Sequence, residues 1–304
     1  MAEPRGGPEG PWAHHFAEVD GVRLHYVRQG AGFPLVLLHG WPGFWYEWAA
    51  VIPPLAAHYD VIAPDLRGFA YSDKPDLPPE EAYKRETVAE EVAALVHQLG
   101  LERVAVVAHD IGATVAQPLA RNHTELVARL VLFDPPYPGI GRRWREPGHV
   151  REVWYQIFHT LPWAPELVGA SREATALYLR HFLTHWSHQK GWVTEAELAR
   201  YVEAYSQPGA LEGGFGYYRA FERFRTSQGE VPPAQLAVPA PTLVLWGEAD
   251  PIIPVAWADR LPEYFPDLTF KRVPECGHFL MRERPDLLVR EVLDFLAPLR
   301  HASS

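Results

Sequence analysis

Cysteine is nearly absent from this chain, and its scarcity excludes several kinds of site. Cys276 is the only cysteine in 304 residues. No disulfide can form within the chain, no multi-cysteine metal site exists, and an oxidising compartment is not implied. Positive charge is also scarce, because 28 basic residues stand against 38 acidic ones, for a formal net charge of -10. Such a surface repels phosphate backbones, so we expect no nucleic-acid partner.

Long apolar runs are missing as well. Runs such as VAVVA at 104–108 are too short to cross a bilayer. Residues 1–14 are rich in glycine and proline and lack the apolar segment of a signal peptide. We therefore expect a flexible tail over 1–14, no membrane association and a cytoplasmic location.

Short apolar segments alternate with helical patterns through most of the chain. The patterns predict helices over 85–99, from about 113, and over 285–298. They predict strands, some running on into loops, over 22–28, 35–38, 59–68, 103–110, 126–134, 241–250 and 268–278. Apolar strands that alternate with helices indicate a mostly parallel sheet covered by helices on both faces.

The alternation stops between Pro138 and Pro232, where no buried strand is predicted. Helical stretches dense in tryptophan, tyrosine, phenylalanine and histidine occur there instead. This composition predicts a helical cap over 138–232, inserted into an α/β core formed by 15–137 and 233–299.

One strand runs into a sharp turn whose tip carries a carboxylate. Residues 108–112 read Ala-His-Asp-Ile-Gly, which matches the small-x-nucleophile-x-small pattern of a nucleophile elbow, with Asp110 at the position of the usual serine. Small residues are needed because that turn is tight. The alternative is an ordinary strand-to-helix turn in which Asp110 caps the helix.

Further strand ends supply the partners that such a nucleophile needs. Asp250 and His278 follow the last two predicted strands, so the chain order is nucleophile, acid, histidine. The loop HGWPG at 39–43 and the elbow itself would supply the backbone N–H groups of Trp41 and Ile111 as an oxyanion hole. Each feature has a structural explanation of its own, but their combination in this order favours a catalytic triad.

Five segments together resemble a known family. They are HGWPGFWYEW, APDLRGFAYSDKP, AHDIGA, LWGEADPIIP and CGHF, and the resemblance extends over about residues 15 to 299. The sequence is similar to the α/β-hydrolase-fold epoxide hydrolases and their dehalogenase relatives. The resemblance implies an α/β-hydrolase fold with an inserted cap and implies no cofactor and no metal.

An aspartate nucleophile suits a substrate whose reacting carbon is sp3. The carboxylate displaces a leaving group and becomes the acyl half of an ester, which water must then cleave. We expect His278 to act as the general base for that water, with Asp250 orienting its ring.

The residue after the nucleophile bears on the leaving group. Haloalkane dehalogenase relatives have an indole there, and haloacid enzymes have arginines there and three residues on, but this chain has Ile111 and Thr114. Dehalogenation of a haloalkane or haloacid stays as the alternative enzymatic function. A non-enzymatic receptor with the same fold is a third hypothesis. The intact nucleophile, acid and histidine argue against it, because a protein that only binds a ligand needs none of them.

An epoxide oxygen leaves as a basic alkoxide, which a tyrosine can protonate. The resemblance places the two cap tyrosines of epoxide hydrolases at Tyr155, in VWYQIF, and Tyr218, in GGFGYYRAF. Tyr217 is the nearest wrong choice, and ordinary aromatic packing is the alternative for both.

Three further groups compete for a role. Asp134 also follows a strand and is an alternative triad acid, and it could instead cap a turn before two prolines. The spacing of His181, His185 and His188 places them on one face of a predicted helix, but we expect no metal there, because the sequence supplies no further ligands. We expect His39 and His109 to hold loops, and Cys276 to pack.

The sequence therefore predicts an enzyme that opens a small epoxide with water to give a vicinal diol. The cap aromatics suggest an apolar or aromatic epoxide. They include Trp154, Phe158, Trp163, Phe182 and Trp186. We expect a monomer or a homodimer.

Overall fold

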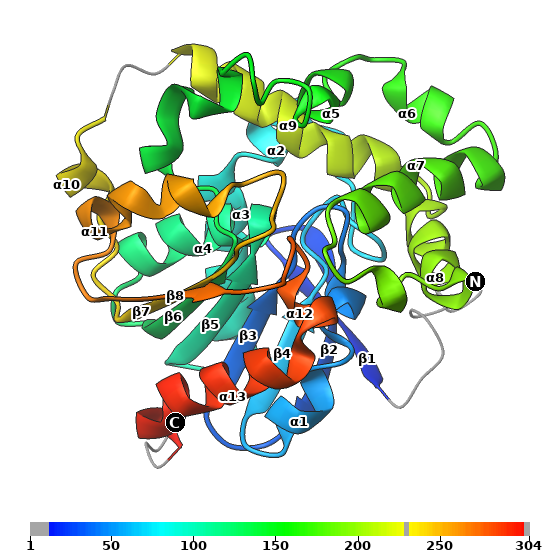
Figure 1. The fold of residues 1–304 in the computed structure, drawn as a ribbon. Coiled ribbons are helices and arrows are strands. Elements are labelled where there is room, and N and C mark those ends of the chain that lie inside the picture. Colours follow the sequence, from blue (N-terminus) through cyan, green and yellow to red (C-terminus); the bar gives the residue numbers. More distant parts are fainter. Residues whose placement is uncertain (1–11, 228–230, 301–304) are drawn as a thin grey trace.

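The computed structural model describes residues 12–227 and 231–300, and it is built around one sheet (Figure 1). The eight strands lie in the order β1-β2-β4-β3-β5-β6-β7-β8. The pairs β1/β2 and β2/β4 are antiparallel, and all pairs from β4 to β8 are parallel. The strands are β1 Ala13–Val19, β2 Val22–Gly30, β3 Pro34–Leu38, β4 Asp60–Pro64, β5 Val104–His109, β6 Val127–Phe133, β7 Thr242–Gly247 and β8 Leu268–Val273.

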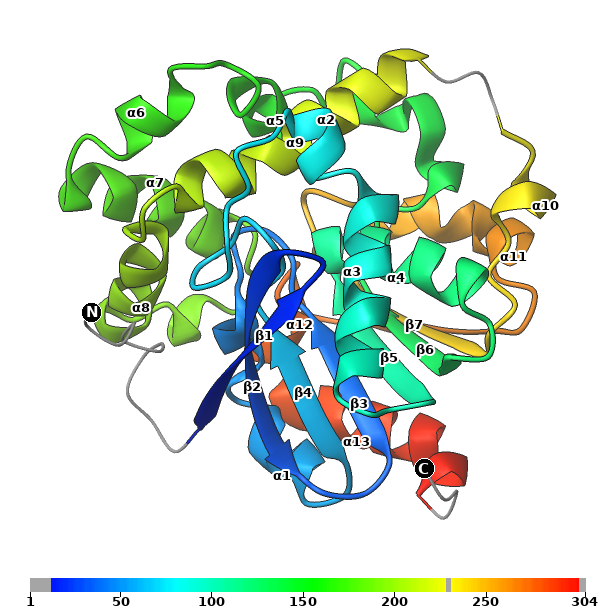
Figure 2. The ribbon, with the colours of Figure 1, turned by 180° about the vertical axis from the view of Figure 1, so that it is seen from behind.

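Helices cover both faces of the sheet, which is why its central strands are apolar throughout. Every residue of β3, β4, β5 and β7 is buried. Helices α3 and α4 lie on one face, and α1 and α13 lie on the other (Figures 1 and 2). The bounds of the core helices are α1 Ile52–Ala56, α2 Pro79–Ala82, α3 Arg85–Gln98, α4 Asp110–Asn122, α10 Pro233–Leu236, α11 Leu261–Tyr264, α12 Leu280–Glu283 and α13 Pro285–Leu296.

The segment between β6 and β7 forms a helical layer at one end of the sheet (Figure 1). It follows the 3-10 segment Pro138–Arg145 and comprises α5 Trp154–Phe158, α6 Ala164–Val168, α7 Arg172–His185, α8 Glu195–Tyr205 and α9 Ala210–Ser227. The rings of Trp41, which follows β3, and Phe215 of α9 lie 5.6 Å apart. The layer therefore packs on the carboxyl ends of the parallel strands, where α/β folds place their ligands.

The structure departs from the predicted elements at three places. Strand β1 begins at Ala13, so the last two residues of the predicted tail belong to the sheet, while 1–11 lie outside the described residues. Helix α4 begins at Asp110, three residues before the predicted start. Helix α7 ends at His185, so His188 does not share a helical face with His181 and His185.

The predicted fold class is confirmed by this sheet and its helices. Across 12–227 and 231–300, none of the helices combines the length and apolarity needed to span a bilayer.

Candidate active site

Asp110 stands at the junction of β5 and α4, in a strained backbone conformation. Its φ is +45°, a left-handed value that side chains other than glycine's adopt rarely. The turn is tight because α4 lies directly against the end of β3. A Cβ atom added at Gly112 would be 2.3 Å from the carbonyl oxygen of Leu38. This close approach explains why a glycine follows the aspartate by two residues.

The two oxygens of the Asp110 carboxylate have different surroundings. Oδ1 accepts a hydrogen bond of 3.0 Å from the backbone N–H of Trp41. Oδ2 lies 3.8 Å from Nε2 of His278, and the side chain keeps 10% exposure. Ile111 lies in the first turn of α4, where backbone N–H groups have no partner within the helix. The structure thus brings Asp110, Trp41, Ile111 and His278 together.

Asp250 and His278 form a buried pair behind Asp110. Nδ1 of His278 donates to Oδ2 of Asp250 at 2.8 Å. The other oxygen of Asp250 accepts the N–H groups of Ile252 and Ile253 at 2.7 and 3.1 Å. The carboxylate is therefore fixed by its own loop, and it fixes the ring of His278 with Nε2 directed at Asp110.

Neighbouring charges control the protonation of His278. Burial lowers the pKa of His278, but the carboxylates of Asp250 and Asp110 outweigh it and raise the pKa to about 9. His278 therefore carries a proton at neutral pH in the resting protein.

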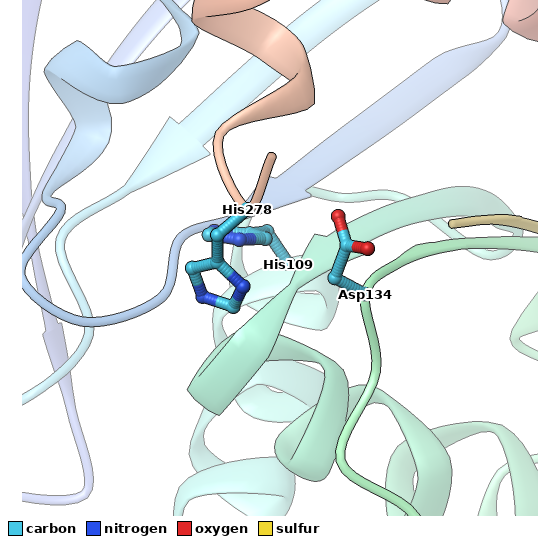
Figure 3. Close-up of side chains that lie close together, drawn as sticks. All are labelled: His109, Asp134 and His278. Atoms are coloured by element: carbon cyan, nitrogen blue, oxygen red, sulfur yellow. The ribbon is translucent and has the colours of Figure 1, made fainter. Parts of the chain in front are cut away.

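Asp134 lies at the end of β6, close to the same histidine (Figure 3). It is fully buried, and its Oδ1 accepts the N–H of Gly247 at 2.8 Å. No hydrogen bond from Asp134 to His278 is present, whereas Asp250 makes one. Asp250 is thus the acid that is hydrogen-bonded to His278, and Asp134 lies close to the same histidine.

Two tyrosines of the helical layer lie near enough to Asp110 for its charge to act on their hydroxyls. The rings of Tyr155, on α5, and Tyr218, on α9, have centroids 5.5 Å apart at 82°. Burial raises the pKa of both hydroxyls, and the negative charge of Asp110 raises both further. Tyr217 points elsewhere, because its hydroxyl donates to the carbonyl oxygen of Arg67 at 3.0 Å.

Aromatic rings surround the two tyrosines. The rings of Phe182 and Trp186 lie 5.4 and 5.0 Å from that of Tyr155. Trp154 and Trp163 instead are 41% and 51% exposed. Sequence reasoning missed His159, whose ring lies 4.5 Å from that of Tyr218 and carries a lowered pKa because it is buried. A histidine four residues after a tyrosine on a short helix was the only available signal.

Glu47 is a second residue that the sequence did not single out. It is fully buried beneath the loop after β3, where Oε1 accepts the Gly40 N–H at 3.2 Å and lies 3.4 Å from Nδ1 of His109. A Cβ atom at Gly43 would meet its other oxygen at 1.9 Å. Glu47 therefore occupies the space that a side chain at Gly43 would fill.

The remaining sequence candidates have structural contacts. Nε2 of His39 accepts the Leu66 N–H at 3.0 Å, so this histidine ties two loops together. Cys276 is fully buried, and burial raises the pKa of its thiol. His185 pairs with Glu152 at 2.7 Å on the surface. Among the described residues, potential metal ligands gather at His109, Asp134 and His278, where His278 is already engaged with Asp250.

Comparison with known proteins identifies the class. A family model described as alpha/beta hydrolase fold matches residues 34–285, and the chain belongs to this family. Among curated proteins, the chain is 36% identical over 296 residues to the soluble epoxide hydrolase of Corynebacterium sp. (strain C12), covering 94% of this chain and 98% of that one. The sequence resemblance to the epoxide hydrolase branch of the family is thereby confirmed.

Solved structures agree in fold over nearly the whole chain. The epoxide hydrolase CorEH without ligand has a TM-score of 0.80 at 34% identity, covering 95% of this chain and 99% of that one. Wild-type Cfl2 from Burkholderia cenocepacia has a TM-score of 0.83 at 32% identity, covering 96% and 99%. Because 95% and 96% of this chain is matched, the similarity includes the helical layer as well as the sheet.

Proposed function

We propose that this protein is an epoxide hydrolase that forms a covalent ester on Asp110. One observation carries the proposal: a carboxylate at a nucleophile elbow faces a buried histidine–aspartate pair, and its charge acts on two buried, neighbouring tyrosines. The similarity to proteins named epoxide hydrolases supports the same reaction.

In the first step, Oδ2 of Asp110 attacks an epoxide carbon while the carbon–oxygen bond of the ring breaks. Oδ2 is the nucleophile because Oδ1 is held by the Trp41 N–H. Tyr155 and Tyr218 hydrogen-bond the epoxide oxygen, and one of them gives it a proton. The raised pKa of both hydroxyls makes a lasting tyrosinate unfavourable, so the lost proton is replaced from protonated His278.

In the second step, water cleaves the ester. Loss of the Asp110 charge removes one of the contributions that raise the pKa of His278, which favours the neutral ring that a general base requires. His278 takes a proton from water as its oxygen attacks Cγ of Asp110. Negative charge develops on Oδ1, where the Trp41 N–H and, we propose, that of Ile111 stabilise it.

The cycle then closes without any added group. The bond from Cγ to Oδ2 breaks, and the diol leaves with Oδ2 after receiving a proton from His278. Asp110 returns its new acid proton to His278 and regains its carboxylate. Asp250 stabilises the charged ring during each transfer.

The surroundings of the tyrosines favour an apolar or aromatic epoxide. Phe182, Trp186 and the Trp41 indole present rings around Tyr155 and Tyr218. Epoxides carrying an aryl or alkyl group would bury that group against them.

Product analysis tests this function. Styrene oxide incubated with the protein should give phenylethanediol, and Asp110→Ala should abolish it while leaving the fold intact. Incubation with 1-chlorohexane and with chloroacetate tests the dehalogenase alternative. Halide release without diol formation from any epoxide would replace our proposal with that alternative.

A further inference from the structure

Glu283 is a buried acid that the proposed mechanism does not use. It is the last residue of α12, a short way along the chain from His278. A buried carboxylate is costly unless its oxygens are satisfied, and here four backbone N–H groups satisfy them. Oε2 accepts those of His188, Gln189 and Gly277 at 2.9, 2.8 and 3.0 Å, and Oε1 accepts that of Phe279 at 3.2 Å.

The four N–H groups belong to two segments that are far apart in the sequence. Gly277 and Phe279 flank His278 in the loop between β8 and α12. His188 and Gln189 follow the end of α7 in the helical layer. A single carboxylate therefore joins the loop of the proposed general base to the layer that covers the site.

The two segments also touch each other directly. The backbone N–H of His278 donates to the carbonyl oxygen of Trp186 at 2.9 Å. A Cβ atom added at Gly277 would meet that same oxygen and would lie 2.6 Å from the backbone nitrogen of His188. The backbones are thus in contact at the point where Glu283 holds them.

Trp186 extends this connection to one of the tyrosines. Its ring centroid lies 5.2 Å from that of His278 and 5.0 Å from that of Tyr155. It also stacks on the ring of Phe279 at 6.1 Å and 21°. The placement of this indole therefore bears on the group that acts on water and on a group that assists the epoxide oxygen.

We propose that Glu283 is a positioning residue for both steps, because it fixes the loop that carries His278 to the segment that carries Trp186. Without its carboxylate, four buried N–H groups lose their acceptor, and the loop and the layer shift relative to each other. That shift moves His278 from the ester on Asp110 and moves Tyr155 from the epoxide oxygen. This inference rests on the proposed function and deepens it.

Glu283→Gln and Glu283→Ala test this role, with Asp286→Asn as the matched control. Glutamine keeps the side-chain volume, but its NH2 group faces a backbone N–H whichever way the amide is turned, since both oxygens of Glu283 are acceptors. Asp286 is an exposed acid in the first turn of α13, so its change to an amide leaves the joined segments alone.

Each protein in excess is mixed with styrene oxide. Rapid-quench mass spectrometry gives the rate constants of ester formation and decay and the amount of ester formed, and thermal unfolding gives the stability. We expect Glu283→Gln to slow formation and decay together, each about 10-fold, and Glu283→Ala to slow each about 100-fold, because small misplacements of catalytic groups are costly. The control should keep both wild-type rate constants.

A merely structural role would lower the stability and the amount of ester formed, while the folded molecules kept both wild-type rate constants. That result in Glu283→Gln, or the slowing of only one step, would overturn the positioning role. Absence of any ester in the wild type would instead overturn the proposed function, so the two failures are distinguishable. If Glu283→Ala does not fold, Glu283→Gln decides the test, because it keeps the side-chain volume.

Discussion

The chemistry assigned to Asp110 depends on the inequality of its two oxygens. Oδ1 is bonded to a backbone N–H, and Oδ2 faces His278. A bonded oxygen is a weaker nucleophile and a better site for negative charge, so the same contacts serve both steps.

The tyrosines should affect only the first step. Because each hydroxyl assists the same leaving oxygen, Tyr155→Phe and Tyr218→Phe should each slow ester formation roughly 100-fold, and the pair together much more. Decay of ester once formed should stay near the wild-type rate. Rapid-quench mass spectrometry measures both rates. Tyr201→Phe is the matched control, because its hydroxyl is buried in the helical layer and has no hydrogen-bond partner among the described residues. If the control variant slowed ester formation as much as Tyr155→Phe or Tyr218→Phe does, the assignment of these two tyrosines to the first step would be contradicted.

The pH dependence should differ between the two steps. His278 has a pKa raised to about 9 while Asp110 is charged, so it is protonated below that pH in the resting enzyme. In the ester the Asp110 contribution is gone, and the pKa falls. Ester decay needs neutral His278, so it should rise with pH through a midpoint below 9, while ester formation stays level until His278 loses its proton.

Single-turnover rates across pH 5 to about 10 measure both profiles. The control is an NMR titration of the His278 ring in the resting enzyme, which should give the higher of the two midpoints. A midpoint for ester decay equal to that of the resting ring would contradict the charge argument.

At the scale of elements, the seating of α9 on the core places Tyr218. A Cβ atom at Gly213 would lie 2.2 Å from the carbonyl oxygen of Gly68, in the loop after β4. Tyr217 anchors the same helix to the same loop through Arg67. Glycine is needed at 213 because the backbones of the helix and the loop touch there.

Gly213→Ala should therefore lift α9 and displace Tyr218 from the epoxide oxygen. We expect slower ester formation, unchanged ester decay and a loss of about 1–3 kcal/mol in stability. Rapid-quench mass spectrometry measures the rates of ester formation and decay, and thermal unfolding measures the stability. Gly148→Ala is the control, because a Cβ atom there meets nothing within 4 Å. Slower decay with unchanged formation would place α9 outside the first step.

At the scale of the whole molecule, the sequence predicted the central parallel strands because burial on both faces forces them to be apolar. Strand β1 was not predicted because it lies at an edge of the sheet. Four of its seven residues carry polar or aromatic side chains that are exposed or half-buried, so no apolar run marks the strand. The start of α4 was placed late because Asp110 has a left-handed backbone, which no propensity suggests.

The site was predictable where chemistry restricts residue type and chain order. Asp110, Asp250 and His278 follow strands whose carboxyl ends must meet at one edge of a parallel sheet. Glu47 and His159 were missed because their positions depend on long-range packing, against His109 in one case and Tyr218 in the other. The same limit explains why the exposure of Trp154 and Trp163 could not be foreseen.

The central claim is that the diol takes its new oxygen from Asp110 and not directly from water. A single turnover with enzyme in excess, run in water enriched in oxygen-18, tests it. We predict an unlabelled diol and heavy oxygen in the peptide that contains Asp110, with peptides containing Asp134 and Asp250 unlabelled. Heavy oxygen in the diol of that first turnover, with none in Asp110, would contradict the account.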